Sequence, residues 1–514
     1  MNPAEPFVAP SIAYGALTPL LLVLGAAVVA VLVEAFVPAR ARSRVHVALA
    51  VAALAAAFVT ACLLAGTEIV TAGGAVVVDG PALFLQAVIC LIGIASVFLL
   101  AERKLDSSGG AVVADAAVVP GSSADRATTA SGTTQTEVYP LTLFALGGMM
   151  LFPASNDLLV MFIALETLSL PLYLMAGLAR RRRLLSQEAA LKYFLLGAFS
   201  SAFFLYGLAL LYGYAGSVRL GAIYEQTRIV GTDEALLLLG IALLAVGLLF
   251  KVGAVPFHSW TPDVYQGAPT PVTALMAAGT KAAAFGALLR VFYVAFPEVR
   301  WDWRPMLWAV AILTMVAGAV LAATQRDVKR MLGYSAIAHT GFILTGVVAV
   351  NPSGLSGSLF YLTAYGFSTL GAFAVVTLVR GPDGEATDLS QWQGLGRRSP
   401  VVAASFALFL FSLAGIPLTA GFISKFGVFE AASAGGAAPL VVVGVVCSAI
   451  AAFFYVRVVV IMFFTEAAPD GPTVAVPSLW TASAVALGVA VTLVLGVIPQ
   501  PLLDLTDAAS VFVR

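Results

Sequence analysis

Ionisable residues inside long apolar stretches are the features of this sequence that could do chemistry. Such stretches hold Glu166, His339 and four lysines, which are Lys192, Lys251, Lys281 and Lys425. A charge at the centre of a bilayer costs about 2.5–3.5 kcal/mol on insertion scales, so membrane proteins keep such charges mainly where they function. Lysine and histidine can take up and release protons, whereas arginine stays protonated. These residue types therefore indicate proton transfer at membrane depth.

The alternative for each charge is a structural ion pair, or a long side chain that reaches the membrane interface. Both roles stay open for Arg290 and Arg457, and for Lys192, which lies close to the expected end of a helix. The functional interpretation is favoured for the other three lysines and for the glutamate.

The composition is that of a membrane protein. Of the 514 residues, 61% are hydrophobic and 11% are charged, whereas soluble domains have about 25% charged residues. The net charge is zero, which argues against nucleic acid as a partner. The three cysteines have neither metal nor redox spacing, and no phosphate-binding loop is present. We expect no cofactor in this chain.

The fold class that follows is an all-α polytopic membrane protein. A spanning helix needs roughly 20 mostly apolar residues, and about fourteen stretches fit that description. They lie near 11–37, 44–66, 81–101, 139–154, 156–178, 190–214, 234–254, 267–297, 305–323, 332–350, 357–379, 400–432, 440–465 and 478–499.

The basic residues support this count and predict the orientation. Sixteen of the 27 basic residues follow odd-numbered spans, five follow even-numbered spans, and six lie inside spans. Because cytoplasmic loops carry an excess of lysine and arginine, both termini are predicted on the non-cytoplasmic side.

Two spans contain helix breakers beside a lysine. Lys251 precedes Gly253 and Pro256, and Lys425 follows Gly415 and Pro417. Interrupted helices at membrane depth are tolerated only inside protein or beside a watery cavity, and paired breaks in two halves mark the transport path of many transporters. Two broken helices are therefore predicted.

The spacing of the charges suggests an internal repeat. Glu166 to Lys251 is 85 residues and His339 to Lys425 is 86, while the following steps to Lys281 and to Arg457 are 30 and 32. A five-helix repeat has an odd number of helices, so the two copies must be inverted in the membrane.

This spacing divides the chain into five parts. The two repeats are predicted at 139–297 and 305–465, after three spans in 1–104 and before a last span and tail in 466–514. Residues 105–138 are rich in Ser, Thr, Gly and Ala, and such a composition predicts a flexible cytoplasmic loop.

Three segments resemble a known family. They are PFHSWTPDVYQGAPTPVTAL at 256–275, LKYFLLGAFSSAFFLYG at 191–207 and DVKRMLGYSAIAHTGF at 327–342. The chain resembles the antiporter-like membrane subunits of proton-pumping NADH–quinone oxidoreductase, respiratory complex I. The DVYQGAPTPVTA segment is similar to the N-type subunits, the bacterial counterparts of mitochondrial subunit 2. The resemblance covers about residues 140 to 465.

The resemblance implies roles for particular residues. Glu166 matches the family's glutamate in the fifth helix, and Lys192 a lysine in the sixth. The lysines of the broken seventh helix, the eighth helix and the broken twelfth helix correspond to Lys251, Lys281 and Lys425. A proton relay through Glu166, these lysines and His339 is the expected mechanism.

The resemblance therefore implies a proton-translocating subunit of the complex. The oxidation of NADH and the reduction of quinone are expected in other subunits. The implied partners are flanking antiporter-like and small membrane subunits, the lipid bilayer and protons. The implied location is the bacterial inner membrane. Two alternatives stay open, namely an Mrp-type cation/proton antiporter subunit and a solute transporter without a redox partner.

Overall fold

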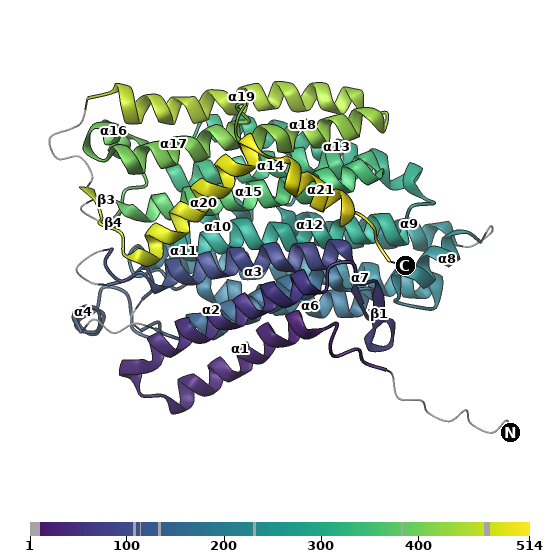
Figure 1. Cartoon of the computed structure of the whole chain (residues 1–514), viewed down its shortest axis with the longest axis horizontal. Helices are drawn as coiled ribbons and strands as arrows, with labels where there is room; N and C mark the ends of the chain where they lie inside the picture. The colour runs from purple at the N-terminus through teal and green to yellow at the C-terminus, as the bar shows by residue number, and fades with distance from the viewer. Residues whose placement is uncertain are drawn as a thin grey trace.

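A computed structural model describes residues 11–105, 109–113, 115–131, 135–229, 233–381, 384–466 and 473–513. The chain forms a bundle whose long helices run roughly side by side, along the horizontal in Figure 1. The start of α1 and the end of α21 lie at the same end of this bundle (Figure 1).

Within the described residues, twelve helical stretches are long and apolar enough to cross a membrane. They are α1 (Thr18–Phe36), α2 (Ala39–Leu63), α3 (Gly80–Ala101), α6 (Leu158–Ala176), α7 (Arg183–Ala215), α9 (Glu234–Val252), the composite Thr270–Ala295, α13 (Arg300–Ala323), α14 (Val328–Ala349), α15 (Pro352–Leu378), α19 (Ala438–Phe464) and α20 (Leu479–Val497).

Two further apolar segments of the predicted fourteen are shorter helices. They are Val138–Ala154, which contains α5 (Val138–Leu151), and α17 (Pro400–Ala414). Every stretch predicted from the sequence thus contains an apolar helix, while the count of fourteen spans and the inverted repeat stay predictions.

The remaining elements are short. The short helices are α4 (Ser123–Ala130), α8 (Leu220–Thr227), α10 (Trp260–Gly267), α16 (Leu395–Arg398), α18 (Ala420–Ala434) and α21 (Gln500–Ala508). The strand β1 (Ile69–Thr71) pairs with β2 (Val76–Val78), and β3 (Val379–Gly381) pairs with both β4 (Gly384–Glu385) and β5 (Thr473–Val474).

Both predicted helix breaks are present. The helix α9 ends before Gly253, and the backbone becomes helical again at α10. The helix α17 ends before Gly415 and is followed by α18. Both glycines adopt the left-handed conformation, with φ of 75° and 84°, which glycine reaches without the steric penalty of a Cβ.

Polar N-caps define where several spans begin. The side chains of Asp79, Asp157, Asp233, Asp327 and Asn351 each accept a hydrogen bond from a backbone N–H in the first turn of α3, α6, α9, α14 and α15, respectively. Such caps satisfy donors that helix starts leave unpaired, which matters at the edge of a hydrocarbon layer.

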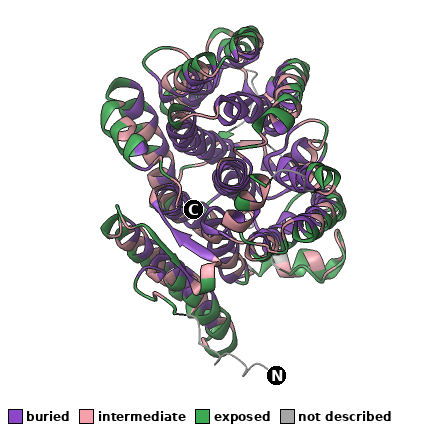
Figure 2. Ribbon diagram, turned by 90° about the vertical axis from the view of Figure 1, so that its right-hand side faces the viewer, coloured by how far each residue is buried: buried purple, intermediate pink, exposed green. Residues whose placement is uncertain are grey.

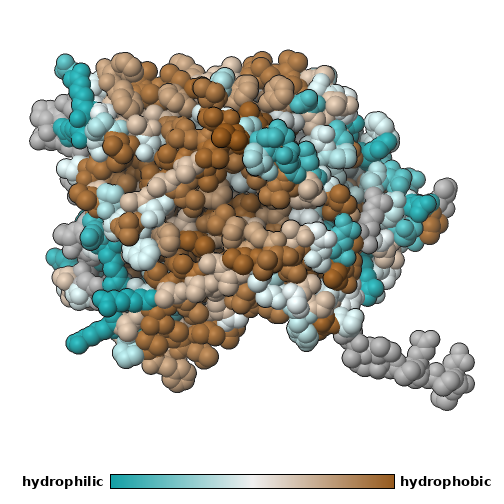
Figure 3. Space-filling view, viewed as in Figure 1, coloured by the Kyte–Doolittle hydropathy of each residue, from teal (hydrophilic) through white to brown (hydrophobic). Residues whose placement is uncertain are grey.

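The centre of the bundle is formed by α14, α15 and the composite Thr270–Ala295, whose residues are almost all buried. Figure 2, which views the helices end-on, shows buried residues in the middle and exposed residues along the outer helices. The outer surface carries a hydrophobic belt, with hydrophilic side chains gathered at the two ends (Figure 3). This pattern is that of a protein surrounded by lipid.

The described part of segment 105–137 is attached to the loop before α7. Val113 N–H donates to Leu178 O at 2.8 Å, and Arg180 Nε donates to Val112 O at 2.9 Å. Arg183 forms an ion pair of 2.9 Å with Asp125, at the start of α4. Flexibility stays a prediction for this segment, but Arg180 and Arg183 hold part of it in place.

The carboxylate of Glu102 links the end of α3 to the start of α20. It accepts hydrogen bonds from Lys104 N at 2.8 Å, Ser478 N at 2.9 Å and Thr481 Oγ1 at 2.8 Å. Burial alone would raise the pKa of this carboxyl, but the hydrogen bonds outweigh burial and bring the pKa below its ordinary value.

Replacing Glu102 with Gln should lower stability by about 1–3 kcal/mol at neutral pH, because a buried charged acceptor loses its donors. A lowered folded-state pKa gives stability that is present above the unfolded pKa of about 4.3 and is lost as the pH falls. The thermal midpoint of Glu102→Gln should therefore fall less than that of the wild type as the pH is lowered. Glu68→Gln, which removes an exposed carboxylate, is the control, and an unchanged midpoint in Glu102→Gln would contradict the assignment.

Candidate functional site

Lys281 lies at the centre of the bundle, where the composite helix changes its geometry. The π-helical segment Met276–Thr280 connects α11 (Thr270–Leu275) to α12 (Lys281–Arg290), and such segments often occur at functional sites. The Lys281 side chain is 3% exposed. Its ammonium group donates to the carbonyl of Ala336 and the hydroxyl of Thr340, both on α14.

Thr340 also connects Lys281 to the break after α9. The Thr340 hydroxyl is 2.7 Å from the carbonyl oxygen of Val252, the residue that follows Lys251. The last turn of α9 and the start of α12 are therefore joined through one hydroxyl group on α14.

His339 continues this polar line on the neighbouring position of α14. Its Nδ1 is 2.7 Å from the hydroxyl of Tyr361 and its Nε2 is 3.3 Å from the hydroxyl of Tyr455. The imidazole is 2% exposed. A neutral imidazole has one donor and one acceptor nitrogen, and a tyrosine hydroxyl can accept or donate. The two tyrosines can therefore form both hydrogen bonds with either tautomer of His339.

Lys425 lies against the end of the broken helix α17. Its ammonium donates to the carbonyl oxygens of Leu413 at 3.1 Å and Ala414 at 2.8 Å, and to Ser448 Oγ at 2.9 Å. These carbonyls have no helical partner because α17 stops there, and the C-terminal end of a helix carries partial negative charge. The break therefore creates the binding site for the ammonium group.

Lys251 lies between aromatic rings. Its ammonium is 5.5 Å from the ring centre of Tyr173 and 5.4 Å from that of Tyr193, close enough for cation–π attraction. Glu166 makes no direct ion pair with Lys251 within the described part of the chain. Glu166 is partly exposed and accepts a hydrogen bond from Ser201.

Lys192 differs from the other three lysines. It lies near the start of α7 with its side chain 43% exposed, and it pairs with Glu188 at 2.7 Å and Asp263 at 2.8 Å. Asp263 also pairs with Arg330 at 2.6 Å. The lysine that the sequence analysis placed in a span near a helix end thus belongs to a half-exposed ion network.

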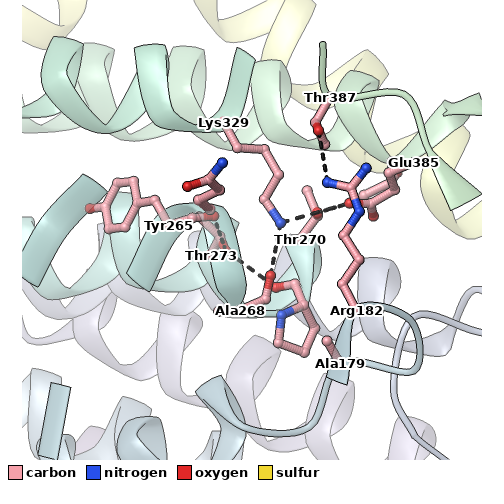
Figure 4. Close-up of polar contacts among 12 residues, drawn as sticks. Ala179, Arg182, Tyr265, Ala268, Thr270, Thr273, Lys329, Glu385 and Thr387 are labelled. Carbon is pink, nitrogen blue, oxygen red and sulfur yellow. Dashed lines mark hydrogen bonds and ion pairs between the residues drawn. The ribbon is translucent and has the colours of Figure 1, made fainter. Parts of the chain in front are cut away.

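A second polar cluster, shown in Figure 4, surrounds Lys329 at the first turn of α14. Lys329 is 3% exposed, donates to Ala268 O at 2.8 Å and lies 3.7 Å from Glu385. Glu385 in turn accepts from the hydroxyl of Thr270, 2.5 Å away. These groups line a small cavity of about 60 Å³ whose rim includes Arg180, Arg181, Arg182 and Arg380.

Arg290 and Arg457 have different environments. Arg290 is fully buried and forms an ion pair of 2.7 Å with the equally buried Asp79, which supports the structural interpretation for this residue. Arg457 is exposed on α19 and donates to Ala323 O at 3.3 Å.

The decisive contrast is the absence of carboxylates around three of the four buried lysines, since the fourth, Lys329, lies 3.7 Å from Glu385. Among the described residues, Lys251, Lys281 and Lys425 have no carboxylate within ion-pair distance, whereas Arg290 has one. Neutral oxygens and aromatic rings stabilise an ammonium less than a carboxylate does, so these surroundings favour the charged form of lysine less than an ion pair would. In the part of the chain that the structure covers, no cluster of three His, Cys, Asp or Glu side chains could hold a metal ion.

Several site residues escaped the sequence analysis. Tyr173, Tyr193, Tyr361 and Thr340 look like ordinary residues of apolar spans, and only the packing of distant helices brings them to the lysines. Lys329 was predicted in a loop because α14 begins four residues before the predicted span.

Comparisons with known proteins agree with this architecture. A family profile described as "NADH:quinone oxidoreductase/Mrp antiporter, TM" matches residues 155–451. NADH-quinone oxidoreductase subunit N of Rhodococcus opacus (strain B4) is 64% identical over 525 residues, which cover 98% of this chain and 97% of that protein.

Two solved structures share the fold. A chain of respiratory complex I from Thermus thermophilus with bound aureothin has a TM-score of 0.77 and 34% identity, over 95% of this chain and 98% of that one. A chain of the Mrp complex from Dietzia sp. DQ12-45-1b has a TM-score of 0.79 and 22% identity, over 96% and 97% of the two chains.

An antiporter-like helical bundle with lysines at its interrupted helices is thus the class that the fold and the site define. Within that class, the chain belongs to the subunit N family of NADH-quinone oxidoreductase.

Because Arg290 has a carboxylate partner and Lys281 has none among the described residues, replacing them should have different effects on stability. Arg290→Met should lower stability by about 3–5 kcal/mol, because Asp79 would remain buried without a partner. Lys281→Met should leave stability unchanged or higher, because it removes a buried charge that has no carboxylate partner. The measurement is the thermal unfolding midpoint of each purified variant. Equal destabilisation by both substitutions would contradict the distinction.

Proposed function

We propose that this chain is the proton-translocating membrane subunit of a complex I-type NADH–quinone oxidoreductase. In this proposal the electron transfer from NADH to quinone occurs in other subunits, and this chain holds no redox cofactor. Its partners are other membrane subunits of the complex, in keeping with the relatives' names and the complex I structure. The resemblance implies that flanking antiporter-like and small membrane subunits are among them.

One observation carries the proposal, namely the set of three lysines that are buried at helix breaks or a π-helical segment and bound to neutral groups. Lys251, Lys281 and Lys425 are 2%, 3% and 5% exposed, respectively. A structural role would favour a carboxylate partner, such as Arg290 has. Groups held by weak neutral partners can change protonation state with small movements of the surrounding helices.

The relay runs across the bundle from Glu166 to Lys425. Protons pass from Lys251 to Lys281, whose surroundings are joined by Thr340. His339 and its tyrosines lie between Lys281 and Lys425, with Tyr365 and Phe342 beside the two ammonium groups at 5.3 Å and 4.8 Å. Water molecules supply the links that side chains do not.

Glu166 controls the first step electrostatically. In the present arrangement it is bound by Ser201 and makes no ion pair with Lys251, so the ammonium form of Lys251 lacks its counter-ion. Movement of Glu166 toward Lys251 would stabilise that form, and separation would favour release of the proton to Lys281. Lys192 lies in the half-exposed network beside Asp263, where it adjusts the local charge rather than carrying protons through the core.

The cavity beside Lys329 and Glu385 gives the relay access to water from one end. Lys329 and the Lys281 acceptor Ala336 are both on α14, seven residues apart, which corresponds to about 10 Å along a helix. The basic rim of this cavity marks the cytoplasmic side by the positive-inside rule. The orientation follows, with both termini on the outer side of a bacterial inner membrane.

An Mrp-type cation/proton antiporter subunit is the second candidate, favoured by the shared fold with the Dietzia Mrp chain. Affinity purification of the tagged chain from mild detergent separates the two candidates. Co-purification with NADH:quinone oxidoreductase activity supports the first, and co-purification with antiporter subunits alone supports the second.

The coupling between Glu166 and Lys251 can be measured directly. Glu166→Gln should lower proton pumping roughly tenfold, the size of a one-unit pKa change in a relay group. Lys251→Ala should abolish or severely impair pumping, because alanine has no group that takes up a proton. The double variant should be no worse than the more impaired single variant, because both substitutions disable the same step. Glu166→Asp should be milder, since the charge remains.

The readout is proton uptake by inverted membrane vesicles, at matched assembly of the complex. Glu225→Gln, which removes an exposed carboxylate on α8, serves as the control and should pump normally. Normal pumping by Glu166→Gln, or multiplicative loss in the double variant, would make Glu166 a packing residue.

A further inference from the structure

A groove of about 680 Å³ lies between α2, the end of α3 and the start of α20, far from the relay residues. Arg40, Arg44, Arg103 and Trp480 line its mouth, while small and branched apolar residues of α2 form its floor. The start of α2, the end of α3 and the start of α20 lie at the same end of the bundle (Figure 1).

The mouth of the groove is strongly basic. Arg40 and Arg44 are exposed, one helical turn apart on α2, and neither has an ion pair or hydrogen bond among the described residues. No Asp or Glu side chain lines the groove. The nearest carboxylate on α1, Glu34, is occupied by Arg42 and His46 at 3.3 Å and 2.9 Å, on a neighbouring face of α2.

The floor has the length of one lipid leaflet. The lining residues Val47, Ala48, Val51, Ala52 and Ala55 recur at three- and four-residue intervals, so they form one continuous stripe below Arg44. The eleven residue steps from Arg44 to Ala55 correspond to about 16 Å of helix, and half of a bilayer's hydrocarbon core is about 15 Å.

Trp480 marks the depth of the mouth. It is 43% exposed and contacts Phe98, with ring centres 5.1 Å apart. Tryptophan is enriched where the hydrocarbon core meets the headgroups, so its position agrees with a headgroup level at the arginines and an acyl-chain level below them.

We infer that this groove binds an anionic phospholipid, with the phosphate at Arg40 and Arg44 and an acyl chain along the α2 stripe. Arginine is the residue that binds phosphate oxygens with paired donors. Arg40 and Arg44, in a groove whose lining includes no Asp or Glu, favour a lipid with net negative charge over a zwitterionic one. A protein partner would require apolar side chains that fit a narrow stripe beneath three cations.

The experiment uses the assembled complex in vesicles that contain phosphatidylglycerol or phosphatidylcholine with a photoreactive acyl chain. After illumination, mass spectrometry maps lipid adducts on residues 47–55. Wild-type protein should be labelled more strongly by the anionic probe, and R40Q/R44Q should reduce that labelling about tenfold. Labelling by the zwitterionic probe should change little.

Two variants separate headgroup recognition from other effects. Arg42→Gln removes a charge from the same turn but outside the groove, so it should keep the labelling. Ala52→Trp fills the floor and should reduce labelling by both probes while the arginines remain.

Equal labelling of the wild type by both probes would show an unselective lipid surface and overturn the inference. Absence of adducts with either probe would show that another subunit covers the groove, which also overturns it. Because pumping is not the readout, either result is distinct from a failure of the proton relay.

Discussion

An ammonium group inside a hydrocarbon layer needs oxygen acceptors, and the carbonyls of an intact α-helix already accept from its own N–H groups, so each offers only its second lone pair. This constraint accounts for the interruptions at the centre of the bundle. The end of α17 leaves free the carbonyls that bind Lys425. Lys281 follows a π-helical segment and donates to the carbonyl of Ala336, which also accepts a hydrogen bond from the Thr340 hydroxyl. The glycines at both breaks, the polar N-caps and the central position of α14 all follow from the need to satisfy backbone groups away from water.

The two helix breaks meet this constraint in different ways. Lys425 follows the break after α17 and binds the carbonyls of that helix. Lys251 precedes the break, in the last turn of α9, and rests against Tyr173 and Tyr193. Rings hold a cation less firmly than carbonyl oxygens aligned with a helix dipole. The ammonium of Lys251 therefore depends more than that of Lys425 on any negative charge that approaches it, as the proposed control by Glu166 requires.

The sequence predicted the features that depend on local composition. Hydropathy located the helices, and the breakers Gly253 and Gly415 located the two interruptions. The buried lysines were recognisable because a charge in an apolar stretch is rare. Partners such as Tyr193 and Thr340 were not, since they are common in spans and acquire a role only through the packing of helices distant in the sequence. Lys192, like the buried lysines, stands in an apolar stretch of the sequence. Its exposure depends on where α7 begins and on its ion pair with Asp263, which lies 71 residues further along the chain.

The cations of this chain divide by the partner each one has. Arg290 has a buried carboxylate and stays charged, so it fixes α12 to the start of α3. The central lysines have neutral partners and can lose a proton without leaving a charge behind. Arg40 and Arg44 in the α2 groove are exposed beside an apolar stripe, where we infer that a lipid phosphate binds them. Under the two proposals, stability, proton transfer and lipid contact depend on separate cations, so a change in one of these properties need not alter the other two.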